Sequence, residues 1–77
     1  MAKSFWDTEK TIATLPKNDR GEEIHVKKVT KGKKEYIDVR SFYPKDNELL
    51  PGKGIAIPID LADEIALKIM EGTKEES

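Results

Sequence analysis

Two stretches of alternating apolar and polar residues, joined by a short loop, constrain the fold of this chain more than any other feature. Residues 23–31 and 35–43 both alternate: Ile24 and Val26 fall on one face of the first stretch, and Ile37 and Val39 fall on one face of the second, as in a half-buried strand. The loop between them contains Gly32, so the two strands are expected to form a hairpin. Pairing their apolar faces fixes the register. The opposite face then carries His25, Lys27, Tyr36, Arg40 and Phe42.

Weaker signals predict two further strands. Residues 11–15 are a candidate first strand, and the turn-forming residues 18–21 follow it. Residues 50–54 contain Pro and two Gly and are expected to form a tight connection. That connection leads into a short fourth strand at residues 55–57.

A helix is expected from Asp60, which can cap it, to Gly72, which marks its end. Its apolar residues cover about half of the circumference. That is more than one small sheet needs, which favours packing against a second helix in a dimer. The alternative is a helix sunk entirely in its own sheet. The residues expected at the dimer interface are Leu61, Ile65, Leu67, Ile69 and Met70.

The ends of the chain are expected to lie outside the folded domain. Residues 1–9 are polar apart from Phe5 and Trp6, and indicate a tail or a short docking arm. Residues 73–77 are charged and polar and are expected to be disordered. One domain at residues 10–72 remains, for a chain of 77 residues. A domain this small needs reinforcement, and with no cysteine and one histidine, oligomerisation is the remaining means.

The residues exclude the common enzyme classes. There is no cysteine nucleophile, and Ser4, Ser41 and Ser77 do not lie in a nucleophile-elbow pattern. There is no phosphate-binding or dinucleotide fingerprint, and no set of residues that could hold a metal. We therefore predict neither an enzyme nor a bound cofactor. No signal peptide and no stretch of about 20 apolar residues is present, so a cytoplasmic, nucleoid-associated protein without membrane contact is expected.

The charge is unevenly distributed, although the net charge is −1. Residues 24–53 carry eight basic and four acidic side chains, whereas residues 60–77 carry two basic and six acidic ones. One basic face and one acidic helix would give this distribution. A lysine-rich hairpin that is merely solvated would give it as well.

A protein that binds single strands needs cations for phosphates and flat rings for unstacked bases. The hairpin offers both kinds of side chain. Alternatively, the rings belong to the core, and Asp38 simply pairs with Arg40 or a lysine. The cations are Lys27, Lys31, Lys33, Lys34 and Arg40, and the rings are Tyr36, Phe42 and Tyr43.

Three segments in this order resemble the single-strand-binding domain of the positive cofactor four (p15) family of transcriptional coactivators. They are Lys31-Gly32-Lys33, Ile37-Asp38-Val39-Arg40 and Pro51-Gly52-Lys53-Gly54-Ile55. The similarity extends from Ile24 to Met70. The family's serine-rich extension is missing, which indicates a short form of bacterial or phage type.

The resemblance implies a curved four-stranded antiparallel sheet followed by one C-terminal helix, an α+β fold that dimerises through its helices. It also implies that Lys27, the Lys31–Lys33 loop, Arg40 and Lys53 contact the nucleic-acid backbone. Tyr43 takes the place of a ring that stacks on bases. Val29 and Thr30 stand where the family often has an aromatic residue, so stacking there would either fall to Tyr36 or be lost.

The function expected from these observations is sequence-tolerant binding of single-stranded DNA by a homodimer. It would act in transcription regulation or in DNA replication and repair, with transcription or repair proteins as further partners. Two alternatives remain open. One is binding of single-stranded RNA, and the other is a protein-interaction module that uses the helix.

Overall fold

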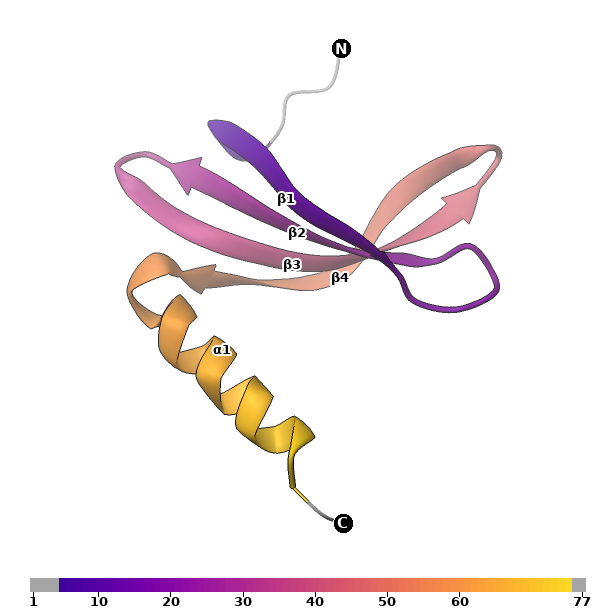
Figure 1. Cartoon of the computed structure of the whole chain (residues 1–77). Coiled ribbons are helices and arrows are strands. Elements are labelled where there is room, and N and C mark those ends of the chain that lie inside the picture. The colour runs from indigo at the N-terminus through magenta and orange to yellow at the C-terminus, as the bar shows by residue number, and fades with distance from the viewer. Residues whose placement is uncertain (1–4, 76–77) are drawn as a thin grey trace.

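The computed structural model describes residues 5–75, which form a twisted four-stranded antiparallel sheet followed by one helix (Figure 1). The elements are β1 (Thr8–Pro16), β2 (Glu23–Lys31), β3 (Lys34–Lys45), β4 (Glu48–Pro58) and α1 (Ile59–Thr73). The strands lie in the sheet in chain order, so each pair of neighbours is a hairpin. The predicted α+β class and the order of its elements are confirmed.

The β2–β3 hairpin has the predicted register. His25 pairs with Arg40 and Lys27 with Asp38, and directly paired residues lie on the same face of a sheet. The turn consists of Gly32 and Lys33, and Gly32 has a φ of 64°, which glycine adopts without steric cost. We call the side that carries His25, Lys27, Asp38, Arg40 and Phe42 the groove face and the other side the apolar face.

The first strand starts earlier than predicted, at Thr8, so the last part of the predicted tail belongs to the sheet. The turn predicted at residues 18–21 is present between β1 and β2. The side-chain amide of Asn18 donates to Glu22 Oε1 at 2.6 Å, and Asn18 Oδ1 accepts from the Arg20 amide at 2.9 Å. The hydrogen bond from Asn18 is the main cause of the lowered pKa of the Glu22 carboxyl.

The fourth strand is much longer than the predicted 55–57, because residues 50–54 are part of it rather than a connection. The hairpin turn is formed instead by Asp46 and Asn47, with φ of 53° and 67°. Both residue types tolerate this left-handed backbone region. The extended β3–β4 hairpin bends away from the rest of the sheet in Figure 1.

A register shift interrupts the β3–β4 ladder. Arg40 pairs with Gly54, whereas Phe42 pairs with Pro51, so β4 has one extra residue there. Such a bulge bends the strand and increases its twist. Gly54 runs so close to β3 that a Cβ atom at this position would lie 2.6 Å from the Val39 carbonyl oxygen.

The helix begins and ends one residue beyond each predicted bound. Pro58 precedes its first residue, and no side chain caps the first turn. Asp60 therefore lies inside the first turn instead of capping it. Gly72 lies inside the last turn, because Thr73 is the final helical residue. The first residues of the tail predicted at 73–77 continue from the helix, and residues 76–77 lie outside the described part of the chain, as do residues 1–4.

No residue of α1 is buried, which contradicts the alternative that the helix is sunk in its own sheet. It contacts β3 and β4 only, and in Figure 1 it projects past β4, away from β1 and β2. The helix is not long and apolar enough to cross a membrane.

The apolar core of the described chain is very small. Val29 and Ile57 are the buried apolar residues of positions 5–75. Large apolar side chains remain exposed, including Ile69 at 62% and Ile55 at 60%. The Cα radius of gyration is 14.2 Å, against roughly 11.5 Å for a compact domain of this length. A single copy therefore leaves much of its apolar surface in water.

Candidate nucleic-acid interface

An open groove of about 700 Å³ lies on the groove face. All four strands contribute to its lining, and so does the segment that precedes β1. The side chains that matter most for binding are Phe5, Trp6, Lys27, Arg40 and Phe42. The sheet thus places two cations and three rings around one hollow.

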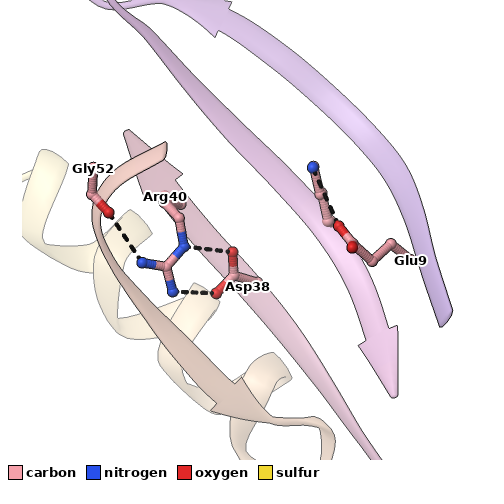
Figure 2. Close-up of polar contacts among 5 residues, drawn as sticks. Glu9, Asp38, Arg40 and Gly52 are labelled. Atoms are coloured by element: carbon pink, nitrogen blue, oxygen red, sulfur yellow. Dashed lines mark hydrogen bonds and ion pairs between the residues drawn. The ribbon is translucent and has the colours of Figure 1, made fainter. Parts of the chain in front are cut away.

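Arg40 is held in the groove by neighbours on both sides (Figure 2). Its Nε donates to Asp38 Oδ2 at 3.2 Å and its Nη2 to Asp38 Oδ1 at 3.0 Å. Its Nη1 donates to the Gly52 carbonyl at 3.1 Å, across to β4. The hydrogen bonds that Arg40 donates to Asp38 raise the pKa of Arg40. Because a guanidinium has five N–H donors, donors remain for a phosphate.

The second cation of the groove forms a weaker pair. Lys27 Nζ lies 3.3 Å from Glu9 Oε1, across the β1–β2 pair. In Figure 2 this contact is the dashed line that ends at the labelled Glu9. Both side chains are partly exposed. Partly solvated pairs of this kind contribute about 0–1 kcal/mol to stability. Glu9 therefore holds Lys27 less strongly than the buried Asp38 holds Arg40.

The ring of Phe42 packs against His25. Their centroids are 4.0 Å apart and their planes are 22° from parallel, and Lys27 Nζ lies 5.2 Å from the Phe42 centroid. His25 Nε2 also contacts Glu23 Oε1 at 2.8 Å. Phe42 lies in the groove as predicted, but one of its faces is already covered.

The lysines at the β2–β3 turn form a separate feature, which we call the lysine loop. It consists of Lys31, Gly32, Lys33 and Lys34 at the end of the hairpin. Lys33 and Lys34 line a smaller hollow of about 340 Å³ together with Tyr36. Within residues 5–75 these two lysines form no ion pair. The basic face predicted as one surface is thus a groove whose cations pair with carboxylates, and an adjoining loop in which Lys33 and Lys34 pair with no carboxylate of the described residues.

Two further predicted contacts lie away from both the groove and the lysine loop. Tyr43 follows Phe42 in β3 and therefore points to the other face of the strand, where it is 40% exposed. Lys53 is exposed and lies in the bulge of β4. The structure brings Lys27, Tyr36, Arg40 and Phe42 to one face but does not bring Tyr43 to it.

The sequence-based prediction missed the contribution of Phe5 and Trp6 to the groove. The Trp6 ring lies 5.5 Å from the Tyr36 ring, and the Phe5 ring lies edge-on to Trp6 at 4.9 Å. The only indication in the sequence was that two adjacent aromatic residues stand in an otherwise polar segment. Their position in the fold could not be predicted, because the residues that they contact are distant in sequence.

Among positions 5–75, no three His, Asp or Glu side chains are grouped closely enough to hold a metal ion. Cations that bind phosphate oxygens and rings that stack on bases are the chemistry that the groove does offer.

Comparison with known proteins agrees with this geometry. The family model described as Transcriptional Coactivator p15 (PC4) matches residues 18–66. The crystal structure of a PC4 homologue from Burkholderia pseudomallei is similar, with a TM-score of 0.76 and 25% identity over 95% of this chain and 100% of that chain. No curated protein matches significantly. The resemblance identified from the sequence is therefore confirmed.

The Asp38–Arg40 pair is expected to stabilise the fold as well as to orient Arg40. Asp38 is 4% exposed, so Asp38→Ala removes a buried acceptor and should lower the free energy of unfolding by about 1–3 kcal/mol. Glu35→Ala is the matched control, because Glu35 pairs with Lys28 at 3.4 Å on the exposed surface. This substitution should lower the free energy of unfolding by less than about 1 kcal/mol. Urea unfolding measures the stability of both variants. Equal losses of stability in Asp38→Ala and Glu35→Ala would contradict a stabilising role of the Asp38–Arg40 pair.

Proposed function

The chain belongs to the Transcriptional Coactivator p15 (PC4) family, and on that premise we propose that it binds single-stranded DNA along the groove face and catalyses no reaction. The observation that carries the proposal is the groove of about 700 Å³ in which Lys27 and Arg40 lie beside Phe5, Trp6 and Phe42. Cations beside rings are what single-strand binding requires.

Arg40 and Lys27 have different tasks in this proposal. The Asp38 carboxylate is almost fully buried and stays with Arg40, so it fixes the plane of the guanidinium while outer N–H groups meet the phosphate. Lys27 exchanges Glu9 for a phosphate. The lysine loop adds positive charge beside the groove, and Lys33 and Lys34 in it pair with no carboxylate of residues 5–75; this charge attracts the backbone of an approaching strand.

Single strands are favoured over duplexes because the rings need exposed base faces, which a duplex keeps stacked. Stacking is tolerant of sequence because every base has such a face. We therefore propose little base preference. A role in transcription regulation or in DNA replication and repair follows from this chemistry, in the cytoplasm and near the nucleoid, with proteins of those processes as partners.

We propose that the protein works as a homodimer joined through α1 and the apolar face. Ile65 is half-buried, whereas Leu61 and Ile69 lie on the same stripe of the helix and are 48% and 62% exposed. Leu67 and Met70 are also exposed, at 53% and 56%. Burial of each such side chain contributes about 1.5–3 kcal/mol, so a second copy would supply the core that one copy lacks.

We expect labelled oligo-dT to bind more tightly than a duplex of equal length, with an affinity that falls as salt is raised. Each neutralised phosphate contributes roughly 0.7 to the slope of log affinity against log salt. Lys27→Ala should weaken binding roughly three- to tenfold and reduce that slope by about 0.7. Fluorescence anisotropy at several salt concentrations measures both.

Lys45→Ala is the matched control, because Lys45 lies at the far tip of the β3–β4 hairpin and should change affinity less than about twofold. Equal binding of single strand and duplex would reduce the groove to a general charge patch. Tighter binding of a matched oligo-U would move the function to RNA. If the protein binds neither the single strand, nor the duplex, nor oligo-U, a protein-interaction module that uses the helix remains.

The dimer predicts a mass twice the chain's 8.7 kDa at micromolar concentration. Ile69→Asp places a charge on the exposed apolar stripe of α1 and should shift the protein to monomer or unfold it. Thr73→Asp adds the same charge at the end of the helix and should leave the mass unchanged. Light scattering after size exclusion is the measurement, and a monomeric wild type would reject the dimer whatever the variants do.

A further inference from the structure

The segment Phe5–Asp7 is fixed to the end of the β2–β3 hairpin, although it precedes the first strand. The Asp7 amide donates to the Thr30 carbonyl at 2.8 Å, and Asp7 Oδ2 accepts from the Gly32 amide at 2.7 Å. Lys31 Nζ donates to the Phe5 carbonyl at 2.8 Å. These contacts hold two rings at the junction between the groove and the lysine loop.

The rings predicted to stack on bases have lost part of their surface to protein neighbours. His25 is stacked on Phe42 at 4.0 Å, and Trp6 lies against Tyr36 at 5.5 Å. Tyr43 points to the other face of β3. The groove therefore needs aromatic surface from elsewhere if bases are to stack in it.

Phe5 and Trp6 supply that surface. Both line the groove together with Lys27 and Arg40, and Phe5 is 68% exposed. Lys31 Nζ lies 4.8 Å from the Phe5 ring centroid, so a cation for a phosphate stands next to a ring for a base. A strand that leaves the groove towards the lysine loop has to pass these two rings.

We propose that Phe5 and Trp6 form a base-stacking wall of the single-strand site, so that the segment before β1 is a binding element. The proposal rests on the proposed function and adds to it the place where bases stack. Trp6 packs against the sheet and offers its remaining surface to the groove, and Phe5 extends that surface towards the lysine loop.

The chain has a single tryptophan, Trp6, so its fluorescence reports on this wall alone. Addition of oligo-dT to the full-length protein should quench Trp6 emission and saturate at the same stoichiometry as the anisotropy of the labelled oligonucleotide. Trp6→Leu keeps apolar bulk but removes the ring, and should weaken oligo-dT binding at least about fivefold, the lower limit for losing one base stack. Trp6→Phe should restore most of the affinity.

Phe5→Leu is the second variant, because the exposed Phe5 ring is not needed for folding. This variant should bind oligo-dT at least about threefold more weakly, which corresponds to the partial loss of one base stack. Oligo-dT that binds without changing Trp6 emission would overturn the wall and leave the proposed function standing. Unchanged or tighter binding by Trp6→Leu and Phe5→Leu would also overturn it and make the segment a cover of the groove. Absence of oligo-dT binding by the wild type would overturn both proposals.

Discussion

A four-stranded sheet has two faces, and residues 5–75 provide one helix and one short segment before β1 with which to cover them. The helix contacts β3 and β4 alone and buries none of its residues. The N-terminal segment covers one end of the groove face and leaves the groove open beside it. These elements leave the groove open on one face and leave large apolar side chains of the sheet and the helix exposed.

The open face is organised by two ion pairs of different strength. The buried Asp38 carboxylate holds Arg40, which also reaches the Gly52 carbonyl of β4. This contact fixes the orientation of Arg40 before any ligand arrives, and a preoriented group loses less conformational entropy on binding. The Glu9–Lys27 pair lies closer to solvent and is held by a single contact of 3.3 Å. The groove therefore combines one cation with three hydrogen bonds to its neighbours and one with a weaker partner.

The sequence predicted the β2–β3 hairpin and the set of residues on its groove face, because alternation determines which side chains share a face. It did not predict the length of β4. Pro51, Gly52 and Gly54 have the composition of a turn, yet they fit an edge strand, where proline is tolerated and a bulge accommodates the extra residue. The helix start was misplaced by one residue because Pro58, with a φ of −54°, precedes it in place of a polar cap. The N-terminal wall could not be predicted, since Asp7 and Gly32 meet across 25 positions of sequence.

Amide NMR of the isotope-labelled full-length protein, with unlabelled oligo-dT added stepwise, tests most directly whether the groove face is the binding surface. Binding along the groove face predicts that the largest chemical-shift changes occur at Phe5–Asp7, at Lys27, around Arg40 and at Gly52, with small changes along α1. Changes confined to α1, or to the lysine loop with the groove unchanged, would contradict it.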